Sequence, residues 1–459
     1  MRAPFARCAI RALGGLAAQL ALAAGVVAAD LPSIEERLRR LEAVVGELRE
    51  ENAALRRELG QGAPAVARAD KPVAPVAAPS VPSVRLSGDI RFRFASTMYR
   101  APEAATRDQL YTQLRVGFLA TPGGGFEAGL RFSAGDLNPN FGGTPGSAQF
   151  SAGDNGSKKH VFVDQAFVRW RPSLGGDAKA AFTFGKSENL FFVPSRLLFD
   201  SDYTPEGFTQ EVTLPLSGRH RAWLAAGQYM LDEISASARD PWLIAARARL
   251  TSQWHEAWWS VFGAGWLGVT HAEQLTAANV GNINRGNTRT RAGVLTHGYR
   301  PFYAEAAVTR LFDRGPGYAG KFPVTFSADL LHNPAAPAQN DAWSAGVTIG
   351  KAGKAGQWEI GYRRHWIEAD AWWEEPLDGD YGAYYRSVPP GWNTDAASTA
   401  GAHGSGTNLR NHSIRTSWSP QDYLLFTANL FLNDLIKKVP SGAIDTAGKR
   451  VQVEGTVRF

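Results

Sequence analysis

The sequence has very little cysteine and no long apolar run after its first 30 residues. One Cys among 459 residues excludes a disulfide-stabilised scaffold. Charged residues make up 20% of the chain and aromatic residues 11%, which is too little charge and too many aromatics for a disordered chain. A helical membrane protein needs apolar runs of about 18 residues or more. These absences leave a large β-rich chain or a soluble multidomain protein of high aromatic content.

Residues 1–29 have the order of an export signal. Three arginines precede an apolar stretch at residues 13–27, and small residues follow ahead of Asp30. This order is typical of a secretory signal peptide, which is cleaved from the mature protein. An uncleaved membrane anchor is the alternative, although the apolar stretch is short for a span. Cleavage would also remove Cys8, the single cysteine, which suits an oxidising compartment.

Residues 30–59 carry apolar residues at alternating spacings of four and three, with one polar position, Asn52, in the seam. The pattern predicts a short periplasmic coiled coil in which Asn52 fixes the register. An ordinary amphipathic helix lying on the following domain is the alternative. Residues 60–83 contain five prolines among Ala, Val and Ser, and this composition predicts a semi-rigid linker.

From residue 84 to residue 459 the apolar period is two. Apolar and polar side chains alternate along residues 86–94, 110–120 and 126–132, and later segments repeat the pattern. Segments of about ten residues with one apolar and one polar face are the signature of transmembrane antiparallel β-barrels. Several tryptophans fall near the expected strand ends, as aromatic girdles at the membrane interfaces require. A soluble β-sandwich also alternates, but its strands are shorter.

The turns predict the number of strands. Tight turns rich in Gly and Pro alternate with longer connections at residues 135–160, 187–206, 270–287, 368–408 and 434–448. The raw count of strand segments is odd. An odd number of antiparallel strands cannot close a barrel whose two chain termini lie on the same side of the membrane. Assigning residues 288–301 to the preceding outer loop leaves about 16 strands, the number we expect, since such barrels have an even count. The alternative of about 18 would need an additional strand.

The last segment, residues 451–459, alternates apolar or small residues with polar ones and ends on Phe459. This ending resembles the C-terminal signature by which the barrel-assembly machinery recognises its outer-membrane substrates. Together with the signal peptide, it predicts a barrel in the bacterial outer membrane, with the N-terminal helix in the periplasm.

Segments 163–170, 184–191 and 200–208 resemble motifs of the proteobacterial putative porin family, and segments 326–333 and 344–371 are similar to it too. The resemblance covers the barrel, and the N-terminal helix is similar in layout to that of phosphate-selective porins. It implies a homotrimer with water-filled pores, surrounded by outer-membrane lipids and lipopolysaccharide. The sequence lacks an obvious long ladder of pore-facing arginines, so phosphate selectivity does not follow.

The connection at residues 187–206 is the best candidate for a loop that narrows the pore. Its charged residues are Glu188, Arg196, Asp200, Asp202 and Glu206. The inward faces of the first strands would oppose it with Arg91, Arg93, Arg115 and Arg131. Acidic and basic groups across an aperture would set a transverse field and tune the choice of ion. The alternative is that these are solvated charges without a selective role.

Nothing in the sequence indicates a cofactor, a metal or a catalytic centre. Asp370, Glu374, Glu375, Asp378 and Asp380 offer oxygen ligands, but their spacing matches no calcium loop, so we expect an acidic, aromatic surface loop there. The histidines show no zinc spacing, and no nucleophile motif is present. Nucleic-acid binding would need a basic patch, which the sequence does not show.

The leading hypothesis is an outer-membrane porin that lets small hydrophilic solutes or ions diffuse passively, without enzymatic turnover. A small excess of basic over acidic residues in the barrel favours a weak preference for anions. The alternative is a structural tether, in which the coiled coil links the outer membrane to the peptidoglycan of the cell wall and the barrel serves as the anchor.

Overall fold

A computed structural model describes residues 83–100, 106–135, 149–156, 158–276, 286–290, 292–386, 402–438 and 444–459, together with Glu50. The predicted signal peptide and linker, and the coiled coil with its Asn52, lie outside these residues apart from Glu50 and Ser83. Among the described residues, no helix is long and apolar enough to cross a membrane.

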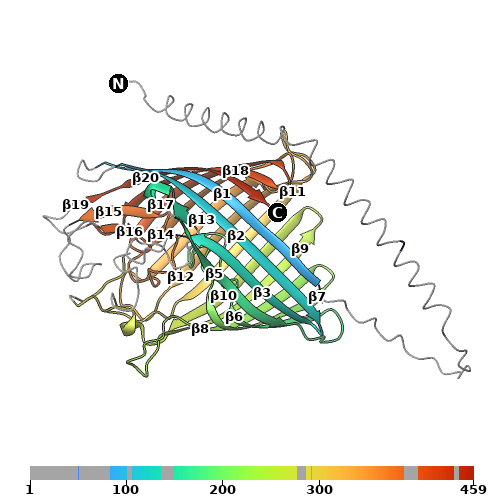
Figure 1. Cartoon of the computed structure of the whole chain (residues 1–459), viewed down its shortest axis with the longest axis horizontal. Helices are drawn as coiled ribbons and strands as arrows, with labels where there is room; N and C mark the ends of the chain where they lie inside the picture. Colours follow the sequence, from blue (N-terminus) through green and yellow to red (C-terminus); the bar gives the residue numbers. More distant parts are fainter. Residues whose placement is uncertain are drawn as a thin grey trace, which may run out of the picture. The chain divides into compact units, whose positions relative to one another are not determined.

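Within the described residues, sixteen strands form a closed antiparallel barrel (Figure 1). They are β1 (Ser83–Tyr99), β2 (Arg107–Gly123), β3 (Phe126–Gly135), β5 (His160–Trp170), β6 (Lys179–Lys186), β7 (Glu206–Ser217), β8 (His220–Met230), β9 (Trp242–His255), β10 (Trp258–Val269), β11 (Phe302–Phe312), β12 (Phe322–His332), β13 (Asp341–Gly350), β14 (Gln357–Ile367), β17 (Leu409–Gln421), β18 (Leu424–Leu435) and β20 (Gly448–Arg458). Each strand pairs with the next, and β20 returns to β1. The prediction of 16 strands is therefore confirmed, and residues 288–301 belong to the loop between β10 and β11.

A few short elements lie outside the sixteen-strand wall. Strand β4 (Gln149–Ser151) pairs with the part of β2 that β3 does not reach. Strands β15 (Gly382–Arg386), β16 (Ala402–Ser405) and β19 (Ile444–Thr446) form a separate three-stranded sheet at the end of the barrel that carries the long loops (Figure 1). Two 3₁₀ turns, Asp154–Gly156 and Ala272–Gln274, complete the elements that these residues form.

The two-residue period places apolar side chains on the outside of the barrel and polar ones on the inside. On β1, Phe92 is 61% exposed, whereas the next residue, Arg93, is 8% exposed. Phe184 and Phe326 are likewise exposed on their strands. This arrangement is inverted relative to a water-soluble protein, because lipid is the solvent that the outer face of a membrane barrel meets.

Aromatic side chains gather where the strands meet their tight turns. The Trp170 ring stacks on Phe126 at a centroid distance of 6.1 Å and on Phe182 at 5.8 Å. Trp418 stacks on Phe426 at 6.1 Å across another hairpin. Tryptophan suits this depth because its ring is apolar and its N–H can reach water or headgroups, so these clusters fit an interfacial girdle.

The C-terminal Phe459 closes the barrel at the seam between β20 and β1. The backbone N–H of Gly88 donates to the Phe459 carbonyl at 2.9 Å, and the N–H of Phe459 donates back at 3.1 Å. A Cβ atom on Gly88 would lie 2.5 Å from Phe459 Cζ and closer still to the carbonyl oxygen of Arg115. Glycine at this position therefore leaves the space that the terminal aromatic ring occupies.

Substituting Gly88→Val should impair barrel closure, because a branched side chain would collide with both the Phe459 ring and the β2 backbone. Overpacking of this kind typically costs about 1–3 kcal/mol. The folded fraction after refolding, measured by the mobility shift of unheated samples in gel electrophoresis, should fall. Gly117→Ala is the matched control, since a Cβ there would meet its nearest atom at an ordinary 3.5 Å. Equal folded fractions for both variants would contradict this role for Gly88.

Candidate pore constriction

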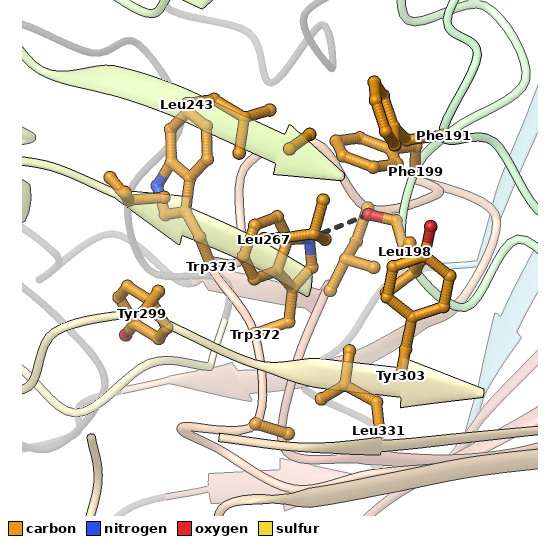
Figure 2. Packing of buried hydrophobic residues seen from close by; sticks show 14 of the residues in the cluster. Phe191, Leu198, Phe199, Leu243, Leu267, Tyr299, Tyr303, Leu331, Trp372 and Trp373 are labelled. Carbon is orange, nitrogen blue, oxygen red and sulfur yellow. Dashed lines mark hydrogen bonds between the residues drawn. The ribbon is translucent and has the colours of Figure 1, made fainter. Parts of the chain in front are cut away.

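The loop that joins β6 to β7 packs inside the barrel against the loop that follows β14. Its Phe191, Leu198 and Phe199 are buried together with Trp372 and Trp373 of the second loop (Figure 2). The inward-facing wall residues of this cluster include Leu243, Leu267, Tyr303 and Leu331. Burying these apolar side chains away from water favours an inward position for both loops.

Directed polar contacts fix the two loops to each other. The Trp372 indole N–H donates to the Leu198 carbonyl at 2.8 Å (dashed in Figure 2), and its ring meets Phe199 edge-on at 5.9 Å. The backbone N–H of Asp200 donates to the Pro376 carbonyl at 2.7 Å. Together with the apolar cluster, these bonds make one packed body of the two loops.

The barrel wall holds the β6–β7 loop through buried polar side chains. Arg247 of β9 donates to the carbonyls of Leu190 and Phe192, both at 2.9 Å, and pairs with Glu305 of β11 at 2.6 Å. On the far side, His365 Nε2 of β14 lies 2.7 Å from the Ser195 carbonyl. Contacts from two separate wall strands, β9 and β14, therefore hold residues 190–195 of the loop in a fixed place in the lumen.

The expectation of an acidic surface loop after β14 is wrong. Glu374 and Trp372 are fully buried, and Asp378 is nearly so. The Glu374 carboxylate pairs with Arg289 at 2.7 Å, and both side chains are fully buried. The loop between β10 and β11, which carries Arg289, supplies the counter-charge that burial requires. That partner is 85 residues away in the sequence, so local composition gave no sign of it.

The remaining side of the lumen, along β20, β1, β2, β3 and β5, carries a group of ion pairs that we call the charged lane. Arg115 of β2 pairs with Asp202 of the inward loop at 3.2 Å and with Asp89 of β1 at 2.7 Å. Arg131 pairs with Asp164 at 2.5 Å. The contact between Arg115 and Asp202 joins a wall arginine to a loop carboxylate, and the sequence predicts this kind of pair.

Other predicted residues have partners that sequence reasoning did not supply. Arg91 and Arg93 of β1 pair with Glu454 of β20 at 3.5 and 3.2 Å, and Arg93 also lies 3.8 Å from Asp380. Glu454 lies two residues after Gln452 on the inward face of β20. The period of two in the sequence is therefore enough to identify Glu454 as a lumen residue. Asp380 was missed because its segment was assigned to the surface.

The loop residues Arg196, Glu188 and Glu206 have three different surroundings. Arg196 reaches across to the second loop and pairs with Asp378 at 2.5 Å. Glu188 pairs with Arg169 of β5 at 2.5 Å. Glu206 is exposed as the first residue of β7, in register with Met230, whose side chain is also exposed, and it stands apart from the lane.

The crowding of carboxylates where the loops meet changes their acidity. Burial, reinforced by the neighbouring Asp378 and Asp202, raises the pKa of Asp200 to about 8. Burial also raises the pKa of Asp378, which lies against Arg196. Burial alone would raise the pKa of Asp380 too, but Arg450, Arg93 and Arg196 hold it well below its usual range. At neutral pH, Asp200 therefore favours its protonated form.

In the folded loop, the pKa of Asp200 is about 8, so its protonated form is favoured below that pH. Raising the pH through about 8 should therefore remove this proton and add one negative charge to the lumen. The ion preference, measured as the reversal potential under a salt gradient, should shift towards cations between pH 7 and pH 9. The variant Asp200→Asn should lack this shift, and Asp313→Asn, at an exposed position in the connection between β11 and β12, should keep it. An identical shift in Asp200→Asn would assign the titration to another group.

Among the described residues, no group of three or more His, Cys, Asp or Glu side chains is placed to hold a metal ion. The close approach of acidic and basic side chains in the lane instead suits electrostatic selection of passing ions.

A search of the curated proteins finds no relative that matches this sequence. The solved structures that resemble it include OprB of Pseudomonas putida at high pH, with 10% identity, 82% of this chain and 94% of that chain covered, and a TM-score of 0.49. The trimer form of OmpT, an outer membrane protein of Vibrio cholerae, shows 11% identity, coverage of 83% and 100%, and a TM-score of 0.42. A mutant of the Rh. blastica porin shows 10% identity, coverage of 82% and 100%, and a TM-score of 0.40.

The strand pairing within the chain establishes the barrel, and these weak structural similarities add no argument for it. A sequence-family model described as "Putative porin" matches residues 101–258, from shortly before β2 to the first residue of β10. This range contains the inward loop and the motifs at 163–170, 184–191 and 200–208. The resemblance to the putative porin family is thereby confirmed over residues 101–258 of this chain.

Proposed function

We propose that this protein is an outer-membrane porin through which small hydrophilic solutes or ions diffuse passively, without enzymatic turnover and with a weak preference for anions. The family match over residues 101–258 and the closed barrel with a lipid-facing apolar exterior support a channel in the bacterial outer membrane. The two inward loops would narrow it, and the charged lane would form the polar side of the aperture.

The observation that carries the anion preference is that the arginine is the more exposed member of most lumen ion pairs. The side chain of Arg131 is 27% exposed against 6% for Asp164, and that of Arg196 is 27% exposed against 2% for Asp378. The pair of Arg169 and Glu188 is an exception, with 10% against 47%. Water and ions in the lumen therefore meet guanidinium groups more than carboxylates, which favours anions.

Purified protein in a planar bilayer should give discrete conductance steps, and the reversal potential under a salt gradient should have the sign of an anion-preferring pore. Arg131→Gln should move the permeability ratio towards cations by a few-fold at most, because a unit charge at 4 Å in water is worth about 1 kcal/mol. Arg310→Gln is the matched control, since this arginine is exposed on the outer face of β11. Folded, inserted protein without steps would refute the porin, and an Arg131→Gln potential equal to wild type would refute the anion preference.

We further propose that the barrel assembles as a homotrimer, in contact with outer-membrane lipids and lipopolysaccharide, after recognition of Phe459 by the barrel-assembly machinery. In this proposal the coiled coil at residues 30–59 joins the three chains in the periplasm. The tether to peptidoglycan is the competing role for this segment.

Deleting residues 30–83 distinguishes the two roles. A porin should keep its single-channel conductance after this deletion, because the described residues that line the lumen belong to the barrel and its loops. A tether should lose its association with purified peptidoglycan in a co-sedimentation assay. Peptidoglycan binding by the intact chain that disappears on deletion would favour the tether for this segment.

A further inference from the structure

One tryptophan of the barrel wall faces the lumen near the tight-turn end. Trp258 and Trp259 begin β10, and consecutive side chains of a strand point to opposite faces of the sheet. Trp258 lies outward, with the guanidinium of Arg310 over its ring at 5.2 Å. Trp259 shares the inward face of β10 with Leu267 of the apolar cluster, and it is 37% exposed there. Lipid meets only the outer face, so Trp259 is not part of an interfacial girdle.

Three threonines continue the line of Trp259 across the next strands. Thr309 of β11 stands in register with Trp259, and Thr325 of β12 stands in register with Thr309. Thr348 of β13 follows opposite Thr325, and Gln253 of β9 flanks Trp259 on the other side. Residues in register share one face of a sheet, so these half-buried side chains all face the lumen. We call Trp259 and the three threonines the threonine row.

The threonine row lies apart from the two inward loops. Tyr303 and Leu331 belong to the apolar cluster that holds these loops. Thr309 and Thr325 lie six residues from them along the same strands, towards the tight turns. Six residues of a strand span roughly 20 Å. The row therefore belongs to the part of the lumen between the packed loops and the tight turns.

The row is uncharged and ends beside an ion pair. Thr348 is in register with Gly361 of β14, and Gly361 is in register with Arg415 of β17. Arg415 lies 3.6 Å from Glu359, and their side chains are 45% and 21% exposed. A guanidinium can only donate hydrogen bonds and a carboxylate can only accept them. A solute lying along the row would therefore meet both kinds of partner at this end.

The hydroxyl groups of the row retain hydrogen-bonding capacity. The Thr309 and Thr325 hydroxyl oxygens lie 2.9 Å apart, so one of the two hydroxyls donates to the other. Each hydroxyl has one donor and two acceptor sites, so their mutual bond leaves one donor and three acceptor sites. Because adjacent strands lie about 4.8 Å apart, the row from β10 to β13 extends over roughly 14 Å.

We propose that the threonine row binds a neutral saccharide on its way through the lumen. A sugar ring has a face of C–H groups that can stack on the exposed Trp259 ring and hydroxyls that can bond to the threonines. The length of the row suits a chain of sugar units, with Arg415 and Glu359 at its end. The inference rests on the proposed function and names one class among the small hydrophilic solutes that pass.

The test measures binding of maltotriose to the purified full-length protein by saturation-transfer NMR, in a detergent without a sugar headgroup. Wild type should bind maltotriose in preference to a polyethylene glycol of similar size. Trp259→Ala should weaken this binding by about tenfold, the upper effect of losing one aromatic contact, and Trp259→Phe should retain most of it. Trp258→Ala is the matched control, because this neighbouring ring lies on the outer face.

The proposal fails if wild type shows no preference for maltotriose, if Trp259→Ala binds as wild type does, or if Trp258→Ala loses as much affinity. Preferential binding of benzoate that disappears in Trp259→Ala would assign the ring to aromatic anions and overturn the saccharide. Should Trp259→Ala fail to fold, the double variant Thr325→Val and Thr348→Val removes two hydroxyls at nearly constant volume. It should weaken binding several-fold, and unchanged affinity would count against the row.

Conductance of the same protein separates this site from the proposed function, because the binding measurement needs no current. Discrete conductance steps without maltotriose binding would remove the saccharide site and leave the porin standing. Maltotriose binding that depends on Trp259, in folded and inserted protein that gives no steps, would refute the porin and leave the site standing.

Discussion

Closure of the sheet between β1 and β20 is the constraint on which the rest of the structure depends. Lipid offers no hydrogen-bond partners, so a strand edge left open in a membrane would leave its backbone groups unsatisfied. The β1–β20 pairing, from Asp89 with Arg458 to Tyr99 with Gly448, removes both edges. Once the sheet is closed, every second side chain faces a confined interior, and the polar residues placed there must find partners among themselves.

The interior meets that requirement in two ways. On the side of β8 to β14, the two inward loops fill the lumen with apolar side chains, and polar groups such as Arg247 and Arg289 are each buried against a carboxylate. On the side of β20 to β5, arginines and carboxylates pair along the wall, and several of them, such as Arg115 and Arg131, remain partly exposed. This asymmetry divides the lumen into a packed half and a charged half, and the charged half is where passing ions would be selected.

The outer surface of the barrel is mainly apolar, in contrast to the interior, and two outward arginines depart from this pattern. Most outward positions are apolar, because lipid is their solvent. Arg310 extends over aromatic rings at the tight-turn end, and Arg364 over Trp343 near the long-loop end. The second of these also contacts His412 of β17, whose other ring nitrogen lies 2.8 Å from the Tyr362 hydroxyl.

The barrel, its strand number and its inward arginines follow from the sequence alone, because the period of two is a local pattern and the even strand count is a global rule for such barrels. The sequence also indicates residues 187–206 as the best candidate for a loop that narrows the pore. The partners of the charged residues depend on the tertiary structure: Arg196 pairs with Asp378, Arg289 with Glu374, and Arg93 with Glu454 and Asp380. These pairs join segments that are 85 to 361 residues apart, and the register and loop packing that bring them together arise only when the sheet closes.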